Sequence, residues 1–158
     1  QKFNNDYEIE NFFIVPEPLI KKEFSRIMSL KDGLKKMSKS EVSDLSRINL
    51  TDDKDQIINK IKKAKTDTLP LPSKIEELEK RPEAKNLIGI YSSLMNNTLQ
   101  KSIDEFAGKN FSEFKEKLSE KVVNEINPIS LKIKDLLNDK VFLEKILKDG
   151  YERANEIA

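Results

Sequence analysis

The residues best suited to chemistry in this chain form one short loop, Lys36-Met37-Ser38-Lys39-Ser40. Two lysines three positions apart can place positive charges on different oxygens of one polyphosphate, and the serine hydroxyls can add hydrogen bonds. A flexible cationic loop suits the departure of a charged leaving group, because contacts made only in the transition state raise the rate. Since lysine and serine are common here, the loop alone also fits an ordinary solvated surface.

The composition excludes several other kinds of site. The 158 residues contain no cysteine and no histidine, so the chain has no Cys-His or Ser-His-Asp nucleophile, histidine-ligated zinc or disulfide. The 29 basic and 28 acidic residues nearly cancel, so overall charge does not indicate a nucleic-acid partner. No apolar run approaches the roughly 20 residues needed to span a bilayer. We therefore expect no metal site and no membrane partner.

The elements that position the loop are predicted to begin with short strands. Residues 12–15 are a run of β-forming side chains that ends at a Pro-Glu-Pro sequence, and residues 26–30 are a second candidate strand. Asp32-Gly33 marks a turn before the lysines. Because one to three short strands do not make an independent sheet, residues 1–48 are predicted to be the C-terminal remnant of a Rossmann-like α/β nucleotide-binding domain.

Residues 49–158 are predicted to form an all-helical bundle, which makes the chain mainly α. Asp53 and Gln56 suggest a capping box for a helix that ends near Lys65, and a second capping box is expected at Ser73 and Glu76. Two prolines in residues 66–72 mark a linker between these helices. We expect further helices that start at Pro82, stop at Gly108, start at Asn110, break at Asn127-Pro128, and start again at Asp139 with a buried apolar face.

The lysine loop is identical to the signature loop of class I aminoacyl-tRNA synthetases, and its flanks resemble the bacterial tryptophanyl type. The resemblance covers nearly the whole chain. The family's upstream signature and the residues that bind the tryptophan side chain are absent from these 158 residues. We therefore expect this chain to be the C-terminal half of such an enzyme. Many family members have proline where this chain has Gly33, and we expect that difference to have little functional effect. The matching segments are residues 15–20, 26–30, 35–40 and 60–64, Thr66-Asp67, residues 81–84, Asn86-Leu87, Ile90-Tyr91, Phe111, Phe114 and Lys115.

The resemblance implies a ligase activity in the complete enzyme. Tryptophan would react with ATP to give tryptophanyl-adenylate and then pass to tRNA(Trp). Lys36 and Lys39 would be catalytic, binding the β and γ phosphates and stabilising the departing pyrophosphate. Mg²⁺ would accompany ATP without a dedicated protein site. The implied ATP-binding residues are Ile27, Lys36, Met37, Ser38, Lys39 and Ser40.

The resemblance also implies partners and a location. Residues 49–158 would contact the anticodon region of tRNA, with Lys60, Lys62, Lys63 and Lys65 as candidate phosphate contacts. The complete enzyme would be a cytoplasmic homodimer, and this chain alone would be inactive. Three alternatives remain: a non-catalytic helical nucleic-acid-binding module, a tyrosyl-specific relative, and a structural helical protein.

Overall fold

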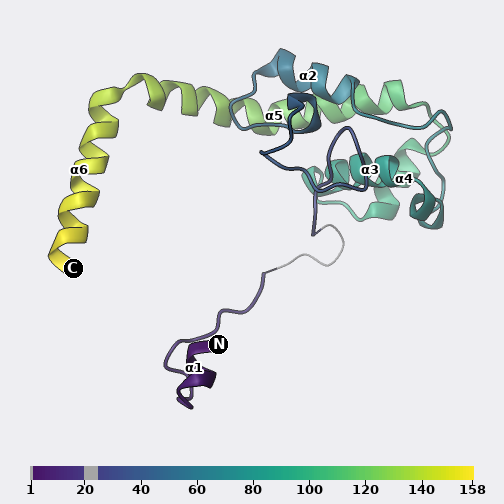
Figure 1. Ribbon diagram of the computed structural model, residues 1–158. Helices are drawn as coiled ribbons and strands as arrows, with labels where there is room; N and C mark the ends of the chain where they lie inside the picture. The colour runs from purple at the N-terminus through teal and green to yellow at the C-terminus, as the bar shows by residue number, and fades with distance from the viewer. Residues whose placement is uncertain (1, 20–24) are drawn as a thin grey trace.

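The computed structural model describes residues 2–19 and 25–158, and the predicted mainly helical fold is confirmed (Figure 1). Short 3-10 helices lie at Asp44–Ser46 and Ile75–Lys80. Within the described ranges, no helix combines the length and apolarity that crossing a membrane requires. The α-helices are α1 (Lys2–Asp6), α2 (Lys54–Lys62), α3 (Pro82–Leu94), α4 (Leu99–Phe106), α5 (Phe111–Asn138) and α6 (Lys140–Ile157).

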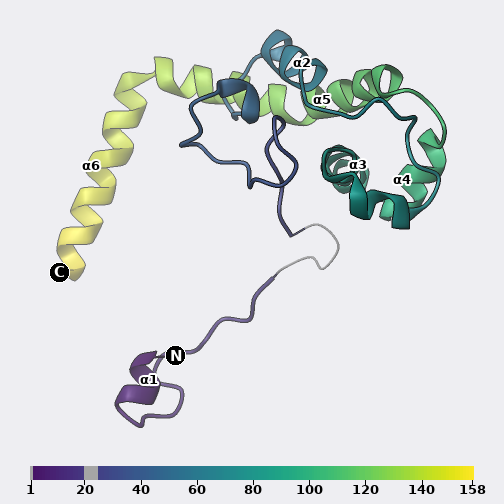
Figure 2. The same ribbon diagram turned by 45° about the vertical axis from the view of Figure 1, so that its right-hand side comes forward.

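The core lies between α2, α3, α4 and the first half of α5 (Figure 2). Three aromatic rings meet at its centre in edge-to-face pairs, with centroids 5.1 Å apart for Tyr91 and Phe106, 5.8 Å for Tyr91 and Phe114, and 5.0 Å for Phe106 and Phe114. The three rings come from three different helices, α3, α4 and α5. Burial of such rings provides much of the free energy that holds helices together.

Most predicted helix starts are confirmed, because their signals are local. Asp53 accepts from the Gln56 backbone N–H and the Gln56 side chain accepts in return, which makes the expected capping box. Asn110 and Asp139 each cap the helix that follows, and Pro82 occupies the first turn of α3. The helix after residue 53 ends at Lys62, slightly before the expected Lys65.

Two local predictions in the helical part are wrong. Ser73 and Glu76 do not form a capping box, since the Ser73 backbone N–H donates to the Glu77 carboxylate and residues 75–80 form a 3-10 helix. Pro128 does not break α5, which runs through it for 28 residues. A proline removes one backbone hydrogen bond of a helix. Because α5 is helical on both sides of Pro128, the loss of that bond does not end the helix.

The predicted burial of the last helix is also wrong. The end of α5 and all of α6 extend away from the core, and no residue of α6 is buried (Figure 1). Its apolar side chains follow the predicted helical spacing, but they are exposed or, at Leu143, half-buried. The spacing of the apolar residues therefore predicted that this segment is helical, but it did not predict whether the apolar face is buried.

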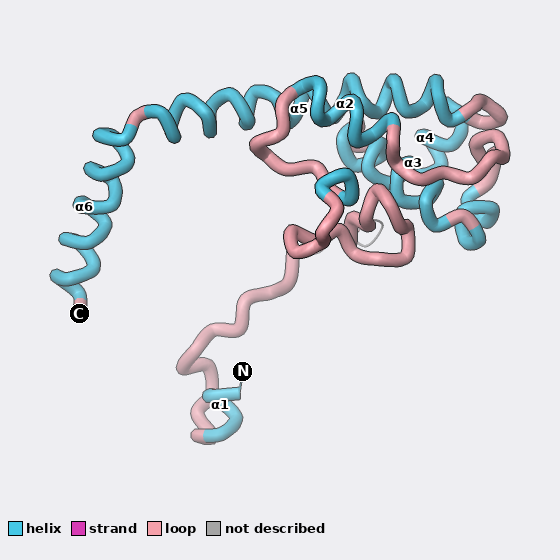
Figure 3. The backbone as a smooth tube through the Cα atoms, turned by 45° about the horizontal axis from the view of Figure 1, so that its top comes forward, coloured by secondary structure: helices cyan, strands magenta, loops and turns pink. Residues whose placement is uncertain are grey.

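The predicted strands are wrong, because the described residues contain no β-strand (Figure 3). The Phe13 backbone N–H and C=O bond to the Asn4 side chain at 3.0 and 2.7 Å, so residues 12–15 have no neighbouring strand. In residues 26–30, Met28 alone forms a β-bridge, and this bridge, to Lys36, is antiparallel and isolated. A strand requires a partner along its length. Ile20, which is part of the family resemblance, lies outside the described residues.

Tyr91 should make unfolding depend on pH in the alkaline range. Burial, together with the hydrogen bond that its hydroxyl donates to Glu105 at 2.9 Å, raises the pKa of Tyr91 from 10.0 to about 12. Since the folded pKa is the higher one, this contribution to stability is complete below pH 10.0 and is lost as the pH rises towards 12. Absorbance of tyrosinate, measured as the difference between the protein and Tyr91→Phe, tests this. A difference titration centred at the ordinary value would contradict it.

Candidate functional site

The lysine loop is attached at its N-terminal end by backbone hydrogen bonds. The Ser29 N–H donates to the Lys35 C=O at 2.8 Å, and the Met37 N–H donates to the Ile27 C=O at 3.1 Å. The Met28–Lys36 bridge lies between these two bonds. Residues 27–29 therefore run antiparallel to residues 35–37 and fix the position where the loop begins.

Asn86, a buried residue of α3, holds this pair of segments against the helical core. Its side-chain amide donates to the Met28 C=O at 2.8 Å, and its carbonyl oxygen accepts the Met28 N–H at 2.8 Å. The two bonds satisfy both backbone groups of Met28, the residue that pairs with Lys36. This role of Asn86 was not predicted from the sequence, where the available signal is a polar residue within the apolar stripe of α3.

The turn before the loop packs against the start of α3. A Cβ atom on Gly33 would lie 2.5 Å from the Pro82 carbonyl carbon and 2.6 Å from the Glu83 nitrogen. Gly33 therefore does more than loosen a turn, since no side chain fits there. Lys65 reinforces this corner: its amine lies 2.8 Å from the Glu83 carboxylate, and its N–H donates to the Leu30 C=O at 2.7 Å. The Lys65 amine lowers the pKa of the Glu83 carboxyl.

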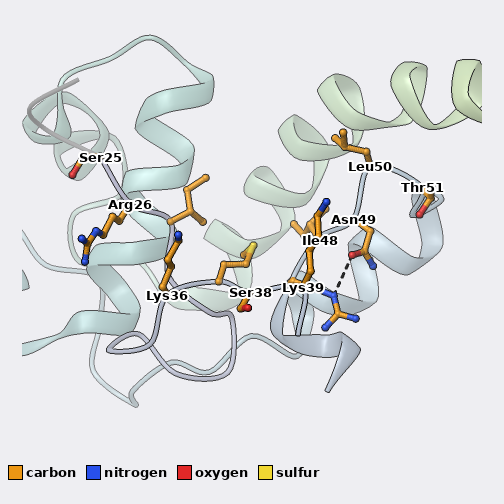
Figure 4. Close-up of a pocket in the computed structure, with 12 residues that line it drawn as sticks. Ser25, Arg26, Lys36, Ser38, Lys39, Ile48, Asn49, Leu50 and Thr51 are labelled. Atoms are coloured by element: carbon orange, nitrogen blue, oxygen red, sulfur yellow. Dashed lines mark hydrogen bonds between the residues drawn. The ribbon is translucent and has the colours of Figure 1, made fainter. Parts of the chain in front are cut away.

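The loop lines a pocket of about 820 Å³ (Figure 4). The pocket brings together five of the six predicted ATP-binding residues, and the sixth, Ser40, lies beside it with its hydroxyl 2.9 Å from that of Ser38. Figure 4 shows Lys36 and Lys39 on either side of Ser38 along the pocket. The predicted residues that line it are Ile27, Lys36, Met37, Ser38 and Lys39.

The charge of this pocket is positive. Lys36 and Lys39 are exposed, and in the described ranges neither amine has a carboxylate within ion-pair distance. Arg26 and Arg47, which were not predicted as site residues, also line the pocket, and no aspartate or glutamate among residues 2–19 and 25–158 does. Arg47 is already paired with Asp44 at 3.1 Å, so the cations offered to a ligand are Arg26 and the two lysines. Three such cations around one space suit a polyphosphate, whose oxygens accept charge-assisted hydrogen bonds.

The four lysines predicted to contact tRNA do not form one surface. Lys60 is buried, with 3% of its side chain exposed, and its amine lies 2.6 Å from Asp52 and 2.7 Å from Asp44. Lys65 is paired with Glu83. Lys62 and Lys63, at the end of α2, are exposed. Spacing along a helix could not separate the buried lysine from the exposed ones, because its two carboxylate partners lie outside α2, before its first residue.

Comparison with known proteins gives the family. The family model for class I tRNA synthetases (W and Y) matches residues 1–127. The tryptophan-tRNA ligase of Caulobacter vibrioides is 48% identical over 158 residues, covering 100% of this chain and 46% of the ligase. That of Brucella melitensis is 45% identical over 176 residues, covering 100% of this chain and 50% of the ligase.

A solved structure agrees with these sequence matches. The crystal structure of tryptophanyl-tRNA synthetase from Mycoplasma pneumoniae aligns with a TM-score of 0.61 at 27% identity, covering 73% of this chain and 36% of that one. The chain spans about half the length of the curated relatives it matches. The resemblance stated from the sequence is thus confirmed, and the chain belongs to the class I tRNA synthetases of the W and Y family.

Proposed function

We propose that this chain provides two parts of a tryptophan-tRNA ligase: the loop that closes over bound ATP, and the helical region that binds tRNA. The observation that carries the proposal is the pocket in which Lys36 and Lys39, both without a carboxylate partner in the described ranges, lie with the hydroxyl of Ser38 between them. The names of the relatives favour tryptophan over tyrosine as the amino acid. The amino-acid pocket itself would be formed by a catalytic half like the one the relatives possess.

The proposed reaction has two steps. The tryptophan carboxylate attacks the α-phosphorus of ATP, the bond from that phosphorus to the bridging oxygen breaks, and pyrophosphate leaves with the electron pair. Lys36 and Lys39 would contact the β and γ phosphates and stabilise the charge that develops on this leaving group. In the second step, the terminal ribose hydroxyl of tRNA(Trp) attacks the adenylate carbonyl and releases AMP.

The adenine would lie against the backbone of Ile27 and Met37, which the Met37–Ile27 hydrogen bond holds side by side. Ser38 and Ser40 would donate hydroxyl or backbone hydrogen bonds to phosphate oxygens. Mg²⁺ would arrive as part of the ATP substrate. The pocket lining supplies cations and hydroxyls, which suit phosphate oxygens, and its described residues include no carboxylate ligand for the ion.

The helical region would contact the tRNA. We assign RNA contact to Lys62 and Lys63, whose amines are at the surface, and leave out Lys60 and Lys65, whose amines are paired. The domain boundary at residue 48 stays a prediction. Dimerisation of the complete enzyme and a cytoplasmic location also stay predictions.

A chimera tests the proposal directly. This chain replaces the matching 46% of the Caulobacter vibrioides ligase, and tryptophan-dependent ATP–pyrophosphate exchange is measured. We expect an active chimera, in which Lys39→Ala lowers kcat about a hundredfold and leaves the KM for tryptophan unchanged, because the lysine acts on the leaving group.

Lys101→Ala, an exposed lysine on α4 that does not line the pocket, is the matched control and should keep full activity. The isolated chain should give no exchange. An inactive chimera, or one that Lys39→Ala leaves unchanged, would contradict the proposal. Salt-dependent RNA binding by an inactive chimera would instead favour a non-catalytic nucleic-acid-binding module.

A further inference from the structure

Lys60 is the feature that the proposed function does not use. It lies on α2 with its amine buried between Asp52 and Asp44, at 2.6 and 2.7 Å. A lysine is seldom buried unless it is paired, and a buried ion pair often adds no more stability than apolar side chains of the same size would. Buried pairs can instead specify one arrangement of the chain. The arrangement that this pair specifies can be followed through its hydrogen bonds.

The hydrogen bonds lead from Lys60 to the lysine loop. Asp44 accepts from the Asn49 amide at 3.0 Å and lies 3.1 Å from the Arg47 guanidinium. Asp52 accepts the Asn49 N–H at 2.8 Å, and Asn49 accepts from Arg47 Nε at 3.2 Å. The two acids and two bases balance in charge. We call these five residues the Lys60 network: Arg47, Asp44, Asn49, Asp52 and Lys60.

The network ends on the residue that follows the loop. Arg47 Nη1 donates to the Glu41 C=O at 2.8 Å. Among the described residues, the other hydrogen bonds at this end are internal to the loop: Ser40 N–H to Ser38 Oγ at 3.3 Å, the two hydroxyls at 2.9 Å, and Glu41 N–H to Ser38 C=O at 3.5 Å. Internal bonds shape the loop but do not attach it to the core.

The two ends of the loop are thus held differently. The beginning is attached by backbone bonds to residues 27–29, and the end is attached through the Arg47 side chain, which belongs to a network around a buried amine. The next backbone bond to the core, from the Leu30 N–H to the Ser46 C=O at 2.9 Å, lies five residues beyond Glu41. We infer that the Lys60 network positions the C-terminal end of the lysine loop, so that Lys36 and Lys39 reach a bound polyphosphate together. This rests on the proposed function. Lys60 and Asp44 are positioning residues and do not contact the substrate.

Backbone hydrogen exchange of the chain tests the attachment without any activity. Lys60→Met keeps a long side chain but removes the amine. We expect amide exchange in residues 38–49 to become about tenfold faster, as loss of charge-assisted hydrogen bonds predicts. Exchange in α3 should stay unchanged. Lys54→Met, the same substitution at an exposed position of the same helix, should change neither region.

Asp44→Asn is a second variant, in case Lys60→Met does not fold. Asp44 is 55% exposed, so the substitution leaves the core intact while it weakens the contacts to Lys60 and Arg47. Faster exchange in residues 38–49 of Asp44→Asn would again support the inference. Unchanged exchange in a folded Lys60→Met, or in Asp44→Asn if the first variant does not fold, would overturn it.

The chimera supplies a readout that a purely structural role would not change. Lys60→Met should lower kcat of ATP–pyrophosphate exchange about tenfold with an unchanged KM for tryptophan, whereas Lys54→Met should match the parent. A fall in kcat and a rise in KM together, with unchanged exchange in the loop, would overturn the inference. If Lys39→Ala has no effect on the chimera, the proposed function fails, while the exchange result still decides whether the network holds the loop.

Discussion

Replacing Gly33 with alanine is expected to lower the free energy of unfolding by about 3 kcal/mol and to separate the lysine loop from α3. The added Cβ would lie 2.5 Å from the Pro82 carbonyl carbon, 2.6 Å from the Glu83 nitrogen and 2.8 Å from the Pro82 oxygen. All three are backbone atoms, so no side-chain rotation relieves the overlap. Either the turn or the first turn of α3 must shift. Denaturant unfolding, followed by circular dichroism, measures the loss.

The same substitution at Gly150 is the matched control. Gly150 lies inside α6 with nothing within 4 Å of the position of a Cβ, so alanine there should not lower stability. In the chimera, Gly33→Ala should also lower kcat for pyrophosphate exchange, because the pairing of residues 27–29 with 35–37 depends on this corner. A Gly33→Ala protein as stable as Gly150→Ala would show that the contact with α3 is not required.

The features that could be predicted from the sequence are those determined by near neighbours. The helix starts after Asp53, Asn110 and Asp139 were predicted because each cap is completed by a residue three positions later. The lysine loop was identified by the order of its residues and of the segments around it. The pocket brings its side chains together with Ile27, and their role in ATP binding stays a prediction.

The features that could not be predicted depend on distant partners. Asn86 bonds to Met28, 58 positions earlier, and Lys60 pairs with Asp44 in the short 3-10 helix that precedes α2. The spacing of residues along a helix does not reveal either partner. Asn86 was therefore given no role, and Lys60 was predicted to contact RNA. The two predicted strands and the buried face of α6 were wrong for the same reason, since a strand or an apolar face becomes regular or buried only against a partner.

Replacing Phe114 with alanine should have the largest effect on stability, a loss of about 3–5 kcal/mol in the free energy of unfolding. Phe114 is fully buried on α5 and its ring packs edge-to-face against Tyr91 of α3 and Phe106 of α4. Removing the ring leaves a cavity where three helices meet, and the surrounding backbone can close it only in part. Denaturant unfolding at fixed temperature measures the loss.

Phe142→Ala is the matched control, because Phe142 lies on α6 and is 42% exposed, so the loss there should stay well below that of Phe114→Ala. The consequence for the site follows from α3, which carries both Tyr91 and Asn86. If Phe114 holds α3 in place, Phe114→Ala should also speed amide exchange at Met28, whose N–H donates to the Asn86 side chain. Equal losses in the two variants would mean that the aromatic cluster is not the centre of the core. A large loss for Phe114→Ala with unchanged exchange at Met28 would mean that the loop is held independently of α3.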